Sequence, residues 1–420
     1  MAVSSSDEKS QRVLVTVTGP DSPGITAALT ETLVGKRVGL RDVEQVVVQG
    51  QLILALLLDL DATPKQGAPV LKDLLFAAKS LGLELQFRVL DHEERAAREE
   101  GAERRRYAVT AIGDGVGATG LHVIAAALAE RRANIEEVRQ LSDGHLSSIE
   151  VIVSLEGPVE ERGPALRRDL VSAVAEYDID VAVQRETVTR RSKRLVVMDM
   201  DSTLIRVECI DELARMHGVV DKVEAITRQA MAGELDFEQS LRERVALLKG
   251  LDYDRVLALS RDLPLTQGAE PLIRVLRILG YKTAVVSGGF TFAAGALKER
   301  LGIDYVYANH LEVSQGKLTG RVLEPIVGPQ RKADLLDAIA QGEGIALEQT
   351  IAIGDGANDL SMLERAGLGI AFHAKPKLKQ AADTSVSAGG LDRILYLLGM
   401  RARDVSEMLA RSEVATEYTS

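Results

Sequence analysis

The sequence predicts an α/β protein in which a doubly wound core with a helical cap follows two smaller modules that share one pattern. Three observations support this prediction. The chain has 420 residues, enough for about three domains of ordinary size. One order of apolar segments occurs twice between residues 12 and 186. Beyond residue 194, short apolar runs alternate with amphipathic stretches, as in a parallel sheet covered by helices on both faces.

The first module is expected at residues 12–92, after a polar segment at 1–11, and the second at 105–186. The first should contain a strand at 13–17, a helix at 24–33, strands at 40–48 and 52–60, a helix at 69–81 and a strand at 83–89. The second repeats this order at 107–112, 121–131, 135–141, 146–155, 164–177 and 179–184. Both follow the βαββαβ order of a ferredoxin-like fold. The period of about 95 residues indicates an internal duplication.

Composition excludes several classes of function. The net charge of −11 gives no basic surface for nucleic acid, and the absence of tryptophan makes base stacking improbable. No apolar run has the length of a membrane span, and the polar N-terminal segment lacks the apolar core of a signal peptide. Cys209 is the single cysteine, which fits a cytoplasmic protein without internal disulfides. We expect Cys209 to be buried and to serve only packing.

Two carboxylates follow the apolar run at 195–198, which reads as a short buried strand. Asp199 and Asp201 are two residues apart, so in a continuing strand both point into the crevice at its carboxyl end. They would repel each other unless a cation lies between them or one is protonated. Oxygen ligands of this kind suit Mg²⁺. The alternative is an acidic turn at a strand end.

Two later segments offer groups to a phosphate. A strand at 283–286 ends in Ser287 and Gly288, a hydroxyl and an unobstructed N–H, although an ordinary strand-to-helix turn would read the same. Lys332 directly precedes the helical pattern at 333–340 and would lie in the first turn of that helix, where it opposes the helix dipole unless it serves an anion. A surface lysine is the other reading.

A further apolar strand at 351–353 leads into an acidic, glycine-containing loop. Asp355 would supply the next carboxylate for the cation, with Asp359 close behind, and a solvated turn is the alternative. The four segments, DxDST, SGG, the helix-initial lysine and GDGxND, resemble in order and content the four motifs of the haloacid dehalogenase superfamily of phosphotransferases. The resemblance extends from residue 194 to about 400.

Within that superfamily the chain most resembles the phosphoserine phosphatases, because of the segment between the first two motifs. A helical cap is expected at about 206–265, with helices at 208–216, 220–231 and 237–248, the last capped by Asp236. The resemblance assigns the substrate's ammonium to Glu208 and its carboxylate to Arg244. A zwitterion needs one such anion and one bidentate cation, although a charged helix face would look similar. Phe237 and Met231 are expected as apolar walls, or as core residues.

The resemblance implies Mg²⁺-dependent hydrolysis of O-phospho-L-serine to L-serine and phosphate, the final step of serine biosynthesis. It assigns Asp199 as the nucleophile that forms a phosphoaspartyl intermediate, and Asp201 as the general acid and base. The remaining assignments are metal ligation by Asp199, the Asp201 carbonyl and Asp355; phosphoryl binding by Ser287, Gly288 and Lys332; orientation of the nucleophile or phosphate by Asn358; and support of Lys332 or a metal-bound water by Asp359.

Two alternatives stay open. One is a related phosphotransferase that uses phosphoserine, or a phosphatase of another small phosphoester, because the chemistry is shared across the superfamily. The other is a catalytically inactive amino-acid sensor. The complete set of motif residues argues against the sensor.

The loop at 19–24 of the first module resembles the ligand loop of the ACT family of amino-acid-sensing modules, and both modules resemble that family. Gly19, Gly24 and the helix start would offer N–H donors to a carboxylate, while Asp21 could pair with an amine. L-serine or another amino acid is the implied regulator. The corresponding loop at 113–120 lacks the Pro-Asp-x-Pro-Gly order, which leaves binding there open. Such modules pair between chains, so the resemblance implies a homodimer.

The segments between these features complete the expectations. Residues 92–106 are read as a charged linker or frayed helix, and 185–194 as a solvated connector to a phosphatase domain at 194–400. A hairpin is predicted at 310–322, a strand at 368–372 and a closing helix at 391–398. Residues 401–420 should hold the end of that helix and a polar tail, disordered from 412.

Overall fold

The computed structural model describes residues 10–36, 38–61, 64–90, 105–144, 147–155 and 162–417. The chain forms two compact units, Met1–Glu103 and Arg104–Ser420, which are considered separately. The predicted linker at 92–106 lies outside the described residues, except for Arg105 and Arg106, which begin a strand.

The first unit is a four-stranded antiparallel sheet in the order β2-β3-β1-β4. Alternate residues of the central strands, such as Val13, Val15 and Val17, are fully buried, as the period of two in a half-covered sheet requires. The predicted βαββαβ order is confirmed. Its elements are β1 (Ser10–Pro20), α1 (Ile25–Glu31), β2 (Val38–Val48), β3 (Gln51–Asp61), α2 (Pro64–Ser80) and β4 (Glu84–Val89).

The second module repeats this topology with the sheet order β6-β7-β5-β8. The pairing register shifts at equivalent places, between Leu40 and Asp42 in β2 and between Ile135 and Glu137 in β6. A bulge at one position in both copies supports the predicted duplication. The elements are β5 (Arg105–Ile112), α4 (Ala118–Glu130), β6 (Asn134–Gln140), β7 (Ser148–Leu155), α5 (Arg162–Ala173) and β8 (Asp180–Arg185).

The sheet of the second module is covered on both faces. Its helices cover one face, and on the other Ile112 and Ala182 belong to the same hydrophobic cluster as Val196 and Ile394 of the following domain. The side chain of Gln184 donates to the carbonyl of Leu397 at 3.1 Å. The second module is therefore packed against the C-terminal domain within one unit.

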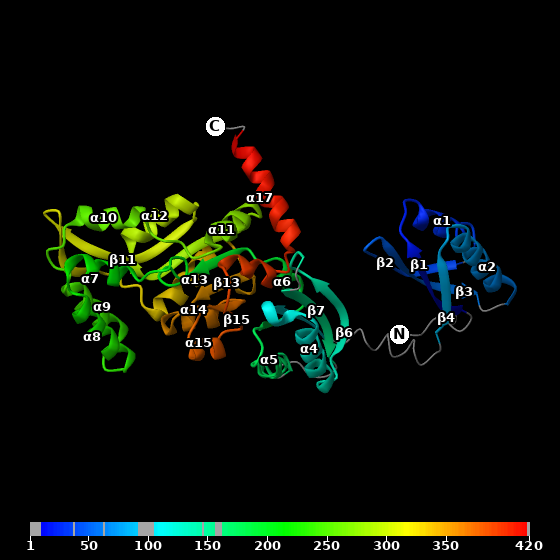
Figure 1. Cartoon of the computed structure of the whole chain (residues 1–420), viewed down its shortest axis with the longest axis horizontal. Coiled ribbons are helices and arrows are strands. Elements are labelled where there is room, and N and C mark those ends of the chain that lie inside the picture. The colour runs from blue at the N-terminus through cyan, green and yellow to red at the C-terminus, as the bar shows by residue number, and fades with distance from the viewer. Residues whose placement is uncertain are drawn as a thin grey trace. The chain divides into compact units, whose positions relative to one another are not determined.

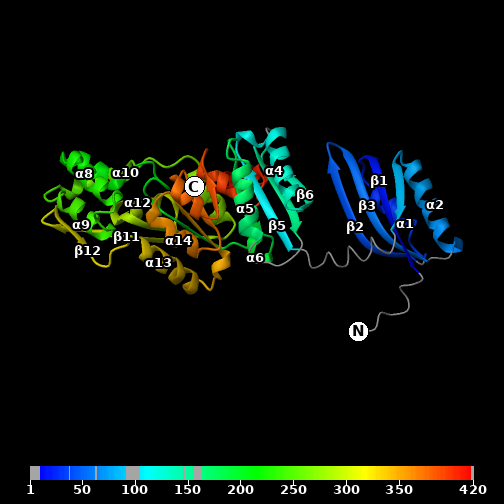
Figure 2. The same ribbon diagram turned by 90° about the horizontal axis from the view of Figure 1, so that it is seen from below.

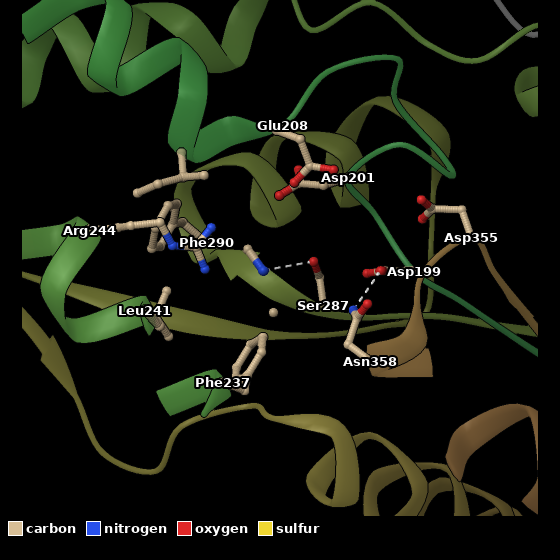
Figure 3. A pocket seen from close by; sticks show the side chains of 13 residues that line it. Asp199, Asp201, Glu208, Phe237, Leu241, Arg244, Ser287, Phe290, Asp355 and Asn358 are labelled. Carbon is tan, nitrogen blue, oxygen red and sulfur yellow. Dashed lines mark hydrogen bonds between the residues drawn. The ribbon is translucent and has the colours of Figure 1, made fainter. Parts of the chain in front are cut away.

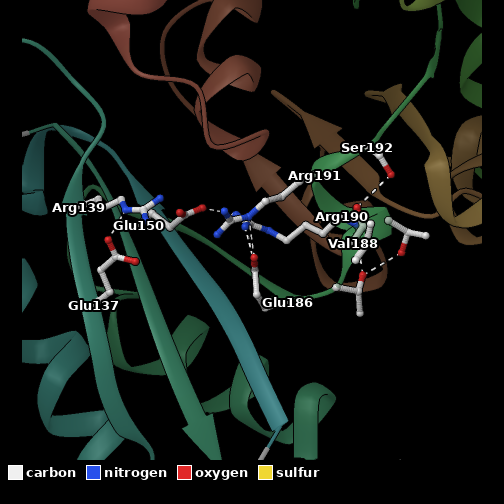
Figure 4. A network of polar contacts seen from close by, with 10 residues as sticks. Glu137, Arg139, Glu150, Glu186, Val188, Arg190, Arg191 and Ser192 are labelled. Atoms are coloured by element: carbon white, nitrogen blue, oxygen red, sulfur yellow. Dashed lines mark hydrogen bonds and ion pairs between the residues drawn. The ribbon is translucent and has the colours of Figure 1, made fainter. Parts of the chain in front are cut away.

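The prediction of a solvated connector at 185–194 is wrong. The connector contains a short helix, α6 (Val188–Arg191), and Arg190 is only 7 % exposed. Its guanidinium forms ion pairs with Glu150 of β7 and with Glu186, the latter at 2.6 Å (Figure 4). Lys193 is also buried and donates to the carbonyl of Glu348 at 2.6 Å. The charges looked solvated because two of these partners, Glu150 and Glu348, are distant in sequence.

The C-terminal domain is built on a seven-stranded sheet in the order β12-β11-β10-β9-β13-β14-β15. Strand β9 (Leu195–Met198) lies at its centre, paired in parallel with β10 (Lys282–Phe290) and β13 (Thr350–Gly354). Leu195 and Val197 face one hydrophobic cluster, Val196 and Met198 the other, so helices cover both faces. The predicted doubly wound core is confirmed.

The remaining strands of the sheet and the helices that cover its two faces complete this domain (Figures 1 and 2). The antiparallel β11–β12 hairpin is the predicted one. These elements are α11 (Ala269–Ile278), α12 (Thr291–Leu301), β11 (Tyr305–Ser314), β12 (Lys317–Leu323), α13 (Pro329–Gly342), α14 (Leu360–Arg365), β14 (Gly369–Phe372), α15 (Pro376–Ala381) and β15 (Thr384–Val386).

The cap consists of α7 (Cys209–His217), α8 (Val220–Met231), α9 (Phe237–Ala246) and α10 (Tyr253–Arg261). Asp236 caps α9 as predicted, because its carboxylate accepts the N–H of Gln239 while the Gln239 side chain accepts the N–H of Asp236. Helix α10 was not predicted. Both views show α8 and α9 at the far end of this unit from the second module (Figures 1 and 2).

The predicted closing helix is a 3₁₀ turn at Leu391–Arg393 followed by α16 (Ile394–Leu397). The expectation of a disordered tail from residue 412 is wrong as far as 417, because α17 (Ala402–Glu417) continues to that residue. Val405, Met408 and Leu409 lie on one side of α17 and pack against the core, which the 3–4 spacing explains. In the part of the chain that the structure describes, no helix has the length and apolarity needed to cross a bilayer.

Candidate active site

The ends of three adjacent strands form the site. Met198 pairs with Val285 of β10 and with Ile353 of β13, so the residues that follow these three positions meet at the carboxyl edge of the sheet. A cavity of about 200 Å³ opens there beneath the cap (Figure 3). It is lined by Asp199, Asp201, Glu208, Ile210, Phe237, Leu241, Arg244, Ser287, Gly288, Gly289, Phe290, Asp355 and Asn358.

Lys332 lies beneath the cavity rather than on its wall. Its side chain is fully buried, and its Nζ is 2.9 Å from Asp199 Oδ1 and 2.6 Å from Asp359 Oδ1. Burial alone would lower the pKa of Lys332, but the carboxylates of Asp199 and Asp359 outweigh it and raise that pKa. Lys332 is therefore a fixed positive charge, and of the two roles expected for Asp359 the contact with Lys332 is present.

The carboxylates of Asp199, Asp355 and Asp359 offer oxygens within 4.8 Å of one another. Asp359 is already engaged at both oxygens, by Lys332 and by the N–H of Gly356. Asp199 Oδ1 accepts from Lys332 and from the N–H of Met200, and Asp355 Oδ1 accepts from Thr203 at 3.1 Å. Asp355 thus keeps one oxygen for a further partner, and Asp199 Oδ2 is met only by Asn358 Nδ2 at a long 3.5 Å. These hard donors fit a divalent cation.

Burial raises the pKa of Asp355 to about 6, with the neighbouring charge of Asp199 as the second cause. Two carboxylates are therefore held together at an energetic cost that a cation would relieve. The sequence-predicted ligands Asp199 and Asp355 are brought together in this structure, while the side chain of Asp201 points elsewhere, toward Glu208 (Figure 3).

Asp201 and Glu208 lie side by side on the cap side of the cavity (Figure 3). The pKa of Asp201 is raised well above its usual range, first by burial and then by the charge of Glu208. Its Oδ1 is buried and has no hydrogen-bond partner among the described residues. Burial also raises the pKa of Glu208, which accepts a hydrogen bond from Ser202 at 2.6 Å. Asp201 can thus hold a proton and deliver it into the cavity.

Cys209 follows directly and is fully buried, as predicted. Burial and the neighbouring Asp201 raise the pKa of its thiol. A neutral buried thiol is a poor nucleophile, which agrees with a packing role.

Ser287, Gly288 and Asn358 form the wall nearest Asp199. Ser287 is buried, and its Oγ accepts the N–H of Gly289 at 2.9 Å. A Cβ at Gly288 would lie 2.8 Å from the Phe237 ring, so this position has no room for a side chain. The side chain of Asn358 lies 3.5 Å from Asp199 Oδ2 (Figure 3).

Sequence reasoning missed Asn309, which is fully buried on β11. Its Nδ2 donates to the carbonyl of Gly288 at 2.8 Å, and its Oδ1 accepts the N–H of Val327 at 2.8 Å. Asn309 thereby ties the end of β10 to the loop before α13, the helix that carries Lys332. A single asparagine within a strand pattern gave no signal of this role.

On the cap, Arg244 lies across the cavity from Asp199 and Asp355 (Figure 3). Its Nε donates to the carbonyl of Ser240 at 3.2 Å, and burial lowers its pKa. Phe237 lines the cavity as expected, together with Leu241 and Ile210, which were not predicted. Met231 does not: it ends α8 and is 67 % exposed, outside the lining.

In the first module, Asp21 and Gly24 line a separate cavity of about 350 Å³ that also contacts Thr26 and Gln45. Gly24 has φ 94°, a conformation that favours glycine. Gly19 is not part of that lining; it packs against Leu83, where a Cβ would come within 2.7 Å of Leu83 Cδ2.

Family models match most of the chain. The haloacid dehalogenase-like hydrolase family matches residues 196–364, and two ACT domain families match 11–88 and 106–184. The phosphoserine phosphatase of Streptomyces coelicolor is 43% identical over 402 residues, covering 94% of this chain and 93% of its own. The phosphoserine phosphatase SerB2 of Mycobacterium tuberculosis is 40% identical over 393 residues, covering 94% of each chain.

Among solved structures, a probable phosphoserine phosphatase from Vibrio cholerae in its unliganded form superposes with a TM-score of 0.54. It is 35% identical and covers 70% of this chain and 86% of its own.

Proposed function

The chain belongs to the phosphoserine phosphatase family of haloacid dehalogenase-like hydrolases, and we propose that it hydrolyses O-phospho-L-serine to L-serine and phosphate. The observation that carries this proposal is the cavity itself. One side holds Asp199 with the buried cation Lys332 beneath it, and the other holds Glu208 and Arg244, a carboxylate and a guanidinium. A phosphate and an amino acid group can therefore be held at once.

Asp199 would attack phosphorus and form an aspartyl phosphate as the bond from phosphorus to the serine oxygen breaks. Asp201, kept protonated by burial and by Glu208, would donate its proton to that leaving oxygen. Asp201 would then take a proton from the water that attacks the aspartyl phosphate, releasing phosphate and restoring both side chains.

Lys332, Ser287 and the N–H of Gly288 would oppose the negative charge on the phosphoryl oxygens. Because Lys332 is held by two carboxylates, its position is fixed before substrate arrives. Asn358, beside Asp199, would orient the nucleophile or the phosphate.

Glu208 would bind the substrate's ammonium and Arg244 its carboxylate, because Arg matches a planar carboxylate in a bidentate manner. The apolar side chains of Phe237, Leu241 and Ile210 would exclude water around the short serine carbon chain.

Mg²⁺ is the cation that we propose for the remaining oxygens of Asp199 and Asp355 with the main-chain carbonyl of Asp201, where it would neutralise charge between nucleophile and phosphate. Regulation by L-serine or another amino acid at Asp21 and Gly24, pairing of the ACT modules into a homodimer, and a cytoplasmic location are further proposals. They rest on the ACT family matches and on the cavity at that loop.

The test is phosphate release from O-phospho-L-serine by the full chain, with Mg²⁺ and with a chelator, beside Asp199→Asn. We expect release that requires Mg²⁺ and is lost in Asp199→Asn. Asp337→Asn is the matched control, because Asp337 lies on α13 in an exposed ion pair with Arg365 and should leave release unchanged.

Other outcomes separate the alternatives. Release from other phosphoesters but not from phosphoserine would keep the mechanism and discard the roles of Glu208 and Arg244. Phosphate transfer to an added alcohol, in place of release, would indicate a phosphotransferase. Serine binding without turnover of any phosphoester would indicate a sensor.

A further inference from the structure

A second cavity, of about 580 Å³, lies within the Arg104–Ser420 unit and away from the active site. Helix α5 and the start of β8 in the second module form one wall, and the end of α15 with β15 forms the other. This volume falls in the range of roughly 300–1,000 Å³ that is usual for small-molecule sites, which often occur between domains. None of the residues assigned above to catalysis, to substrate or to the regulatory loop lines it.

The walls are held in place by contacts across the interface. Asp180 of β8 accepts hydrogen bonds from Ser385 Oγ at 2.7 Å, from the N–H of Ser387 at 2.6 Å and from Ser387 Oγ at 2.7 Å. The hydroxyl of Thr384 donates to the carbonyl of Val181 at 3.4 Å. The cavity is therefore bounded by an ordered interface rather than by two unconnected surfaces.

Its lining combines apolar and cationic side chains. Val171, Val174 and Ile179 form an apolar wall, and Val171 is 45 % exposed. Three cationic residues (Arg167, Arg168 and Lys379) and two carboxylates (Asp178 and Asp180) also line it, so the lining carries one net positive charge.

The charged side chains of the lining differ in how many of their polar atoms have hydrogen-bond partners. Asp180 already accepts three hydrogen bonds. Arg167 donates through Nη2 to the carbonyl of Lys379 at a long 3.4 Å, and its buried Nε has no partner among the described residues. Burial lowers the pKa of Arg167, only partly opposed by Asp383. A buried donor without an acceptor is costly, and an anion in the cavity would satisfy it.

We propose that this cavity is a binding site for a small organic monoanion with an apolar body, such as an aromatic carboxylate. The carboxylate would accept from Arg167 and the apolar body would cover Val171, Val174 and Ile179.

The test uses 2-naphthoate as the probe and the full chain, with binding measured by isothermal titration calorimetry. We expect one site per chain, and binding at least about fivefold weaker for the neutral analogue 2-naphthalenemethanol, since a charge-assisted hydrogen bond is lost. Val171→Trp should fill the cavity and weaken 2-naphthoate binding by at least about tenfold. Val138→Trp is the control, because Val138 is similarly exposed, at 48 %, on β6 and outside the cavity.

Arg167→Gln should weaken binding by at least about fivefold, and Arg168→Gln, at an exposed position of the same wall, gives a second variant if Arg167→Gln unfolds. Circular dichroism of each variant checks folding. The proposal is overturned if 2-naphthoate does not bind at millimolar concentration or if Val171→Trp binds as the parent does. It is also overturned if orthophosphate or L-serine displaces the probe, which would place the probe in the active site or at the Asp21 loop.

Discussion

Replacing Arg190 with methionine should destabilise the Arg104–Ser420 unit strongly, although Arg190 touches no part of the active-site cavity. Arg190 lies between Glu150 and Glu186, and the three side chains are 5%, 3% and 15% exposed. Methionine fills a similar volume without charge. The substitution would therefore leave two carboxylates close together with little water to separate them.

The size of the effect follows from this burial. Removing one partner of a buried ion pair costs about 3–5 kcal/mol, because the remaining charge stays buried without compensation. Glu186 keeps a second contact, with Arg191 at 2.7 Å, and is the more exposed of the two carboxylates. We therefore expect about 3 kcal/mol, the lower end of that range.

The assay is urea unfolding of the full chain, followed by circular dichroism, with Arg365→Met as the control. Arg365 pairs with Asp337 at 2.8 Å, but both side chains are exposed, so its loss should cost less than about 1 kcal/mol. Glu150→Gln added to Arg190→Met should recover part of the stability by removing the unpaired charge. The reasoning is refuted if Arg190→Met costs no more than Arg365→Met, or if the double variant is no more stable than Arg190→Met.

Three further predictions concern the active site. Arg244→Lys should raise KM for O-phospho-L-serine by about 10–100-fold with a smaller change in kcat, because a bidentate contact becomes a single one; an equal fall in kcat would contradict a ground-state binding role. Asn309→Asp should lower kcat with little change in KM, because Asp keeps the acceptor for Val327 but places a carboxylate against the Gly288 carbonyl. Steady-state kinetics measure kcat and KM, and thermal unfolding measures stability; a loss of stability with unchanged kcat would contradict this role. As the pH falls below 6 and Asp355 gains a proton, the Mg²⁺ concentration for half-maximal phosphate release should rise about tenfold for each pH unit. If this concentration is constant from pH 5 to 8, Asp355 is excluded as a ligand.

The parts of the fold that the sequence predicted best are those governed by local pattern. Apolar alternation placed the strands of both modules, and Asp236 marked the start of α9 because a capping box involves only four neighbouring residues. The strand ends with Asp199, Ser287 and Asp355 could be grouped in advance, since parallel strands bring their carboxyl ends to one edge.

The parts that were missed depend on distant partners. Arg190 reads as a solvated charge until Glu150, 40 residues away, is seen beside it. A surface position was the alternative for Lys332, but it is fully buried, because its two carboxylate partners follow β9 and β13. Asn309 and the wall residue Leu241 have no local signature, and Met231 was misplaced because an apolar residue at a helix end can face either way.

One sheet face of the second module packs against the C-terminal domain, and this packing determines where the chain can be cut. A cut near residue 104 falls between two compact units, whereas a cut near 190 would strip the C-terminal domain of the partners of Arg190 and uncover the surface beneath Ile112 and Ala182. The two modules share one topology but belong to different compact units of the chain. The second module belongs to the same folded unit as the catalytic domain, because it supplies Glu150 to the buried ion pair and Ile112 and Ala182 to the shared hydrophobic cluster.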